Sequence, residues 1–280
     1  MKKMSFIGTG IMGSAIAKAA CKGCEPQDIV LTDYNKIKAK ELADTIGATL
    51  VETNEEAVRQ SKYILIAVKP QVANDVLSQI GPVIEECIKN GEEKVLVSIM
   101  VSISIGQIKE MLGISVDVPI IRTLPNVAAE VGKCITICAK SESVTDDIFD
   151  EYQEILRYTG SFELLAEKKM YAGSVITGCG PAFVSMFIEA LADGGVMTGL
   201  SRAQAQKFAV ETLIGTASLI AETGKHPEQL KDEVCSPGGS TIAGVVSLEK
   251  NGFRNATVQC VLDTFNRILD MGNFDEKEVV

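Results

Sequence analysis

A glycine pattern near the start of the chain constrains the fold more than any other feature. An apolar segment at residues 4–7 leads directly into this pattern, and a helical stretch follows it as far as Ala20. The pattern is GxGxxG and consists of Gly8, Thr9, Gly10, Ile11, Met12 and Gly13. The next apolar segment, 29–32, is followed by the acidic residue Asp33. This order predicts a dinucleotide site, because the glycines let a pyrophosphate approach backbone N–H groups at the start of a helix.

Asp33 also bears on the choice of cofactor. A carboxylate at the end of the second strand can accept hydrogen bonds from both ribose hydroxyls of NADH, but it repels the 2′-phosphate of NADPH. Lys36 and Lys38 follow closely and carry the opposite charge. We therefore expect binding of NAD(P)H with NADH favoured, and NADPH stays open as the alternative.

Short apolar runs alternate with polar or amphipathic stretches as far as Ala166. The expected strands are 4–7, 29–32, 48–51, 63–68, 95–99, 119–123, 134–139 and 162–166. This alternation predicts an α/β fold with a mostly parallel, doubly wound sheet, in which ligands bind beyond the carboxyl ends of the strands. Two of those ends carry polar or rigid residues, AVKPQ at 67–71 and RTLPN at 122–126.

The pattern changes after Ala166 to long helical segments. The expected helices are 167–175, 182–200, 202–223, 227–234 and 241–271, the last with a break at 251–252. We therefore expect a dinucleotide-binding domain at 1–166 and an all-helical domain at 167–280. The helix at 182–200 is apolar nearly all round, which predicts packing against another subunit. Its two carboxylates, Glu189 and Asp193, argue against a membrane span.

The overall composition excludes several classes of function. A net charge of −10 argues against partners such as nucleic acid or an anionic membrane surface. The eight cysteines lie mostly in apolar stretches with no signal peptide ahead of them, so we expect a reducing, cytoplasmic location. Cys21 and Cys24 have CxxC spacing but no second pair or histidine beside them, and we interpret them as packing residues. The single histidine, His226, argues against a histidine triad or a metal site and is interpreted as a loop residue.

A second glycine-rich turn, CSPGGSTIAG at 235–244, also leads into an expected helix. Unpaired backbone N–H groups and the positive end of a helix dipole make such a turn a site for an anion. The alternative is purely structural, with a Ser or Thr side chain capping the helix.

Six motifs in order along the chain resemble the pyrroline-5-carboxylate reductase family. They are GTGIMG at 8–13, AVKPQ at 67–71, RTLPN at 122–126, TGCGPAF at 177–183, HPEQL at 226–230 and SPGGSTI at 236–242. The resemblance runs almost end to end. It implies a Rossmann-type domain followed by a helical dimerisation domain, and a homodimer or higher homo-oligomer with intertwined helical domains. It also implies the last step of proline biosynthesis, in which a nicotinamide reduces the C=N bond of 1-pyrroline-5-carboxylate to L-proline.

The resemblance also assigns residues. The turn at 8–13 matches the pyrophosphate site, Asn54 matches a polar contact to the dinucleotide, and Ser240 and Thr241 match the positions that hold the substrate carboxylate. The loop near the nicotinamide is matched by Ala67, Val68, Lys69 and Pro70. The chain departs from the family at Val101 and Ser102, where Ala-Gly is common, and at four other positions: Leu124, Cys134, Thr177 and Cys179.

Reduction of an imine needs orientation more than side-chain chemistry, because the cofactor supplies the hydride. We therefore expect the backbone N–H groups of Gly239, Ser240 and Thr241 to bind the substrate carboxylate. The Thr241 hydroxyl is the candidate catalytic group, since it would lie near the ring nitrogen.

Two other functions are weighed against this one. A 3-hydroxyacid dehydrogenase has a catalytic lysine and an asparagine one turn later, where this chain has Val184 and Ile188. A regulatory protein could keep the fold and bind NAD(P)H without turnover, and the fold alone does not exclude it.

Overall fold

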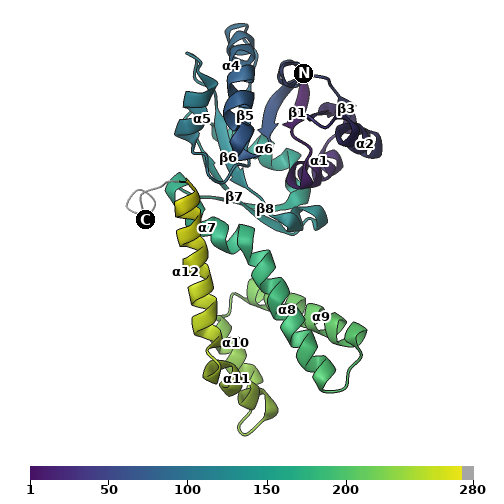
Figure 1. The fold of residues 1–280 in the computed structure, drawn as a ribbon, viewed down its shortest axis with the longest axis vertical. Helices are drawn as coiled ribbons and strands as arrows, with labels where there is room; N and C mark the ends of the chain where they lie inside the picture. The colour runs from purple at the N-terminus through teal and green to yellow at the C-terminus, as the bar shows by residue number, and fades with distance from the viewer. Residues whose placement is uncertain (273–280) are drawn as a thin grey trace. The chain divides into compact units, whose positions relative to one another are not determined.

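The structure, a computed structural model, describes residues 1–272 and divides into two compact units (Figure 1). Unit 1 comprises Met1–Cys179 together with the chain from Phe265 onward, and unit 2 comprises Gly180–Thr264. This division differs from the expected bounds of 1–166 and 167–280, because residues 167–179 and the last turns of the final helix pack with unit 1, where Leu269 contacts Tyr171. As a statement about domains, the boundary at residue 166 stays a prediction.

Unit 1 contains an eight-stranded sheet with strand order β3-β2-β1-β4-β5-β6-β7-β8. The strands are β1 (Lys2–Ile7), β2 (Ile29–Thr32), β3 (Thr49–Leu50), β4 (Ser61–Ile66), β5 (Val95–Ser98), β6 (Ile120–Leu124), β7 (Cys134–Lys140) and β8 (Gly160–Leu164). Neighbouring strands run parallel except β6 and β7. The predicted α/β class and the mostly parallel sheet are confirmed.

Helices cover both faces of this sheet (Figure 1). In unit 1 they are α1 (Ile11–Gly23), α2 (Lys36–Ile46), α3 (Asn54–Gln60), α4 (Ala73–Lys89), α5 (Ile105–Leu112), α6 (Asp146–Ile155) and α7 (Met170–Ser174). Successive strand residues face opposite sides. In β1, Phe6 packs with Ile16 and Tyr152 of α1 and α6, whereas Ile7 packs with the cluster that contains Leu77 and Ile108 of α4 and α5. Burial on both faces explains why the strands read as continuous apolar runs.

The strand order reverses at β1, which has β2 on one side and β4 on the other. Ile7 at the end of β1 pairs with Ile66 at the end of β4. The loops that follow these two strands therefore leave the sheet at the same edge, where open α/β sheets bind their ligands.

Unit 2 is all helical. A π-helix at Val175–Cys179 leads into α8 (Gly180–Met197), followed by α9 (Arg202–Thr223), α10 (Pro227–Val234), α11 (Ser240–Lys250) and α12 (Phe253–Gly272), whose last turns belong to unit 1. The expected helices 202–223 and 227–234 have the observed bounds, and the expected break at 251–252 separates α11 from α12. Ser201 begins α9 with a capping box to Gln204.

The helical run Glu167–Met197 is long and apolar enough to cross a membrane by length and composition, with a mean hydropathy of 1.6. Only 11% of its most apolar window is buried in a single copy of the chain. An exposed apolar surface of this kind is typical of an interaction site, and the sequence predicts another subunit as the partner that covers it.

A buried lysine supports the edge of the sheet opposite the strand ends described above. Lys94 precedes β5, and its Nζ donates to the backbone oxygens of Val58 (2.8 Å), Arg59 (3.3 Å) and Ser61 (2.9 Å). Its side chain is fully buried, and Glu92 lies 3.1 Å away as an ion-pair partner. The ammonium thus satisfies carbonyls at the negative end of α3 and joins that helix to β4 and β5.

Substitution Lys94→Met is expected to lower the free energy of unfolding by about 2–4 kcal/mol, because these carbonyls lose a charged donor. Urea denaturation at fixed protein concentration measures the change. Lys89→Met is the matched control, since that lysine is 60% exposed in an ion pair with Glu85 and is expected to change stability by less than about 0.5 kcal/mol. Equal losses in the two variants would contradict the role of Lys94.

Candidate active site

The predicted dinucleotide turn lies between β1 and α1, and its glycines are required by close backbone approaches. Gly8 has φ +106°, and a Cβ there would lie 2.6 Å from the Ala67 oxygen. A Cβ on Gly13 would lie 2.3 Å from the Gly8 oxygen. The turn, α1 and the loop after β4 are therefore packed backbone to backbone, which no residue with a side chain would permit.

Gly10 occupies a different environment, with open space where a Cβ would stand. It is the N-cap of α1, and no side chain caps the helix there or places an acidic group in its first turn. The first N–H groups of α1 therefore have no capping side chain, and the positive end of the helix dipole faces open space. An uncapped helix start with open space beside Gly10 fits a pyrophosphate, which would accept from those backbone N–H groups.

Asp33 holds the turn in shape. One carboxylate oxygen accepts from Thr9 N–H at 2.5 Å and from Thr9 Oγ1 at 3.1 Å, and the other accepts from Asn35 N–H at 2.7 Å. The sequence predicted this carboxylate as a ribose ligand and gave no sign of these internal bonds. They occupy three of its roughly four acceptor positions, so Asp33 both fixes the turn and retains capacity for a ribose hydroxyl.

A cleft of about 590 Å³ opens at the turn, wholly within unit 1. It is lined by Gly10, Ile11, Met12 and Gly13 of the turn, by Ala67, Val68, Lys69 and Pro70, by residues 99–102, and by Ile268 and Met271. Its volume is typical of small-molecule and cofactor sites. The structure thus brings together most of the predicted cofactor residues, and Lys69 places an exposed cationic side chain at the cleft.

Residues 99–102 were not among the predicted site residues, although the resemblance placed the departure at Val101 and Ser102 in a loop near the cofactor. They follow β5, which lies next to β4 in the sheet. The rule that ligands bind beyond strand ends could have found them. Ile268 and Met271 lie on the last turns of α12, and no motif near them indicates a place in the cleft. They line it together with residues that are far earlier in the sequence.

Asn54 is not among the residues that line the cleft. It is the first residue of α3, and its Nδ2 donates to Gln79 Oε1 at 2.9 Å. Its contact to the dinucleotide stays a prediction.

The second glycine turn belongs to unit 2 and connects α10 to α11. Gly238 has φ +69°, and Gly239 N–H donates to the Ser236 oxygen at 3.0 Å. Gly239 is the N-cap of α11, and no side chain caps this helix. The alternative in which a Ser or Thr side chain caps the helix is therefore wrong. The first N–H groups of α11, which include those of Ser240 and Thr241, have no capping side chain, and both residues are exposed.

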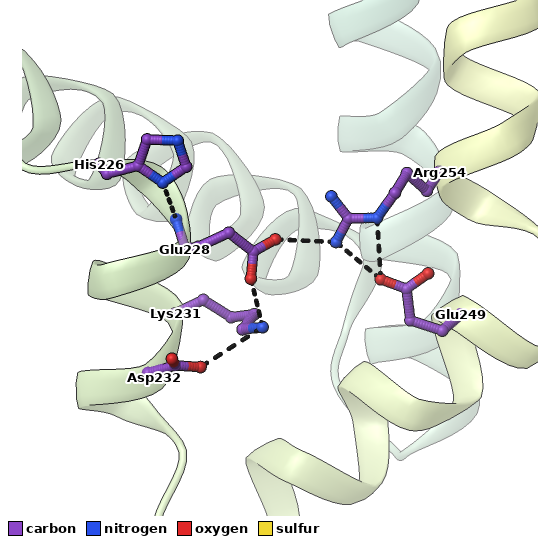
Figure 2. A network of polar contacts seen from close by, with 6 residues as sticks. All are labelled: His226, Glu228, Lys231, Asp232, Glu249 and Arg254. Carbon is purple, nitrogen blue, oxygen red and sulfur yellow. Dashed lines mark hydrogen bonds and ion pairs between the residues drawn. The ribbon is translucent and has the colours of Figure 1, made fainter.

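Charged side chains link the helices on both sides of this turn (Figure 2). Arg254 Nη2 lies 2.9 Å from Glu228 of α10 and 2.8 Å from Glu249 of α11, and Lys231 bonds Glu228 from the same helix. The hydrogen bonds from Lys231 and Arg254 hold the pKa of Glu228 below its usual range. Arg254 therefore ties α10 and α11 to the start of α12, with the turn between them.

His226 and the CxxC cysteines have structural environments. Nδ1 of His226 accepts from Glu228 N–H at 3.3 Å and caps α10 (Figure 2). Burial raises the pKa of the Cys21 thiol to about 11 and also raises that of Cys24, so both are neutral thiols of low reactivity near pH 7. Within residues 1–272, no group of three or more potential ligands that could hold a metal ion is found.

Two family models match the chain. Residues 3–102 match the family described as NADP oxidoreductase, coenzyme F420-dependent, and residues 167–271 match pyrroline-5-carboxylate reductase dimerisation. The second match begins at residue 167, which is the first residue of the expected helical domain.

Full-length relatives give a more specific result. The pyrroline-5-carboxylate reductase of Synechocystis sp. is 38% identical over 272 residues, covering 96% of this chain and 98% of that protein. The enzyme of that name from Pisum sativum is 35% identical and covers 94% of each chain. A crystal structure of Plasmodium falciparum pyrroline carboxylate reductase with NADP bound has a TM-score of 0.83 at 30% identity and covers 97% of this chain and 98% of that one. With matches over nearly the whole of both chains, this protein belongs to the pyrroline-5-carboxylate reductase family.

Proposed function

We propose that this protein is an NAD(P)H-dependent pyrroline-5-carboxylate reductase that acts on a CH–NH bond and forms L-proline in the last step of its biosynthesis. The observation that carries the proposal is the pair of uncapped helix N-termini, one at the glycine turn of α1 and one at the glycine turn of α11. The first suits a pyrophosphate and the second a small carboxylate. The full-length relatives named above support the same reaction.

The cofactor, when bound, supplies the hydride. The protein supplies binding and orientation. The N–H groups at the start of α1 hold the pyrophosphate, and residues 67–70 form one side of the cleft. Gly13 allows α1 to approach the turn after β1 closely. In this position the first N–H groups of α1 can reach the pyrophosphate.

The substrate carboxylate binds the start of α11 in this proposal. Because Gly239 N–H already donates within the turn, the donors are mainly the N–H groups of Ser240 and Thr241, while Gly239 permits the close approach. Replacing Gly239 is unfavourable, since a Cβ would lie 2.4 Å from Ser236 Oγ. The Thr241 hydroxyl orients the ring nitrogen or relays a proton to it, directly or through water.

A direct assay tests the function and the cofactor preference together. Purified protein mixed with 1-pyrroline-5-carboxylate is expected to consume the absorbance of the reduced nicotinamide, and consumption with NADH is expected to exceed that with NADPH because of the Asp33 carboxylate. Oxidation of neither cofactor would overturn the function and favour a binding protein without turnover. Equal rates would overturn the proposed role of Asp33 in cofactor choice, with Lys36 and Lys38 as the compensating charges.

Substitution Thr241→Ala is expected to lower kcat/KM by about tenfold or more, because the hydroxyl that orients the ring nitrogen is lost. Steady-state kinetics with saturating cofactor measure the effect. Thr241→Ser retains the hydroxyl and is the matched control, expected to keep most of the activity. Unchanged kcat/KM in Thr241→Ala would remove Thr241 from the chemistry.

The protein is proposed to act as a homodimer or higher homo-oligomer. Unit 2 has an apolar groove of about 660 Å³, lined by residues of α8, α9, α11 and α12. Phe187 and Phe253 meet in it with ring centroids 5.6 Å apart, and Met186 is 70% exposed on its wall. The match to the family's dimerisation model covers these helices and supports a second copy of the chain as the partner.

Substitution Met186→Asp is expected to raise the dimer dissociation constant by about 30-fold or more, the effect of losing a central apolar contact. Sedimentation equilibrium over a range of concentrations measures it. Met197→Asp is the control, because Met197 is 89% exposed on the same helix but does not line the groove. An unchanged constant in Met186→Asp would show that the groove is not the interface.

The dehydrogenase alternative lacks its chemistry in this chain. The positions of its lysine and asparagine are Val184 and Ile188, both on α8. Neither side chain can take a proton from an alcohol. A soluble, cytoplasmic enzyme remains the proposal for its location, on the composition described above.

A further inference from the structure

Arg122 is a fully buried charge beside the proposed cofactor cleft. It lies on β6, where it pairs with Ser98, the last residue of β5, and with Ala139 of β7. Its side chain has no exposed surface. The residues that follow Ser98 form the wall of the cleft at 99–102, so Arg122 stands level with the start of that wall.

The guanidinium contacts this wall directly. Nη2 donates to the backbone oxygen of Val101, and Nη1 lies 3.1 Å from Glu167 Oε1. The Cζ atom lies 4.9 Å from the ring centroid of Tyr171 in a cation–π contact. Arg122 therefore joins three segments: the loop after β5, the turn before α7, and α7 itself.

Glu167 completes the connection from its other side. The same Oε1 atom accepts from Ile105 N–H at 2.7 Å. Ile105 is the first residue of α5, where a carboxylate is favourable because of unpaired N–H groups and the helix dipole. The loop from β5 to α5 is thus held at Val101 by Arg122 and at Ile105 by Glu167.

A buried ion pair is frequently no better for stability than apolar residues of the same size. The Nε atom of Arg122 is buried with no hydrogen-bond partner among the described residues. A planar guanidinium, however, bonds the carbonyl and the carboxylate from two separate nitrogens in a fixed fork, whereas an apolar side chain has no donor and a lysine has a single rotatable ammonium.

We propose that Arg122 is a positioning residue, which holds residues 99–102 in the shape that the reduced nicotinamide cofactor requires. It acts through the Val101 carbonyl, with Glu167 and Tyr171 holding the guanidinium in place. Val101 and Ser102 both line the cleft, so the path of this loop affects the width of the cleft. The inference rests on the proposed function only for its kinetic consequence, since the cleft and its wall are features of the free protein.

The test compares Arg122→Lys and Glu167→Gln with wild type and with Lys94→Met. Lysine keeps the charge but not the fork. The Glu167→Gln variant keeps an acceptor for Ile105 N–H and for Arg122 at a partly exposed position, and it is expected to fold. Lys94 is equally buried but lies at the opposite edge of the sheet, which makes it the control for lost stability alone.

Two measurements are made on the protein without substrate. Nicotinamide fluorescence gives the Kd for NADH and NADPH, and hydrogen exchange gives the rates of the amides at 99–105. Arg122→Lys is expected to weaken binding of the cofactor about fivefold and to speed exchange across these amides, with a smaller effect in Glu167→Gln. Lys94→Met is expected to change neither. A kinetic measurement then follows, in which kcat of Arg122→Lys is expected to fall about tenfold because the cofactor is misplaced.

Unchanged Kd and unchanged exchange at 99–105 in both variants would overturn the proposal and leave Arg122 a purely structural residue. If Arg122→Lys does not fold, the result for Glu167→Gln decides on its own. Failure of the proposed function can be told apart from failure of this proposal. In the first case the wild-type protein would bind the cofactor without turnover, and the binding and exchange measurements would still test the role of Arg122.

Discussion

The candidate cofactor cleft depends on one close contact between two backbone segments, Gly8 after β1 and Ala67 after β4. A Cβ at Gly8 would lie 2.6 Å from the Ala67 oxygen, so the two segments can meet only at a glycine. The contact occurs where the strand order reverses, and it brings the glycine turn and the loop at 67–70 to one edge of the sheet. The Asp33 carboxylate, bonded to Thr9, then fixes the turn that leads into α1.

An acidic protein with anionic ligands needs local donors. The net charge of −10 gives no long-range attraction for a dinucleotide or a carboxylate. Two uncapped helix starts, at Gly10 and Gly239, provide such donors from the backbone. A side chain at Gly239 would enter the turn itself, whereas the space beside Gly10 is open.

Much of the fold was predictable because its signals are local. Apolar runs and the GxGxxG turn identified the parallel sheet. Each expected strand is present, one with the expected bounds (29–32) and others with shifted ends, for example 63–68 against Ser61–Ile66. Residues 10–13 of the turn and residues 67–70 line the same cleft, and their contacts to a cofactor stay predictions. The roles assigned to Asn54, Ser240 and Thr241 stay predictions. Ile268 and Met271 were missed, since no spacing or motif reports that the end of α12 packs beside a loop more than 160 residues earlier in the sequence.

The sequence by itself determined the succession of strands and helices along the chain, the two glycine turns and the resemblance to the family. These follow from residue type and short spacing. Only the tertiary structure decided that Asp33 accepts hydrogen bonds from Thr9 and that Gly239 N–H donates to Ser236 in its own turn. It also decided that Arg122 is buried against Val101, Glu167 and Tyr171. The physical reason is that hydrogen bonds and burial depend on distances between segments far apart in the chain. An arginine in RTLPN reads as a polar residue at a strand end, and its partners become evident only when β5, β6 and α7 are packed together.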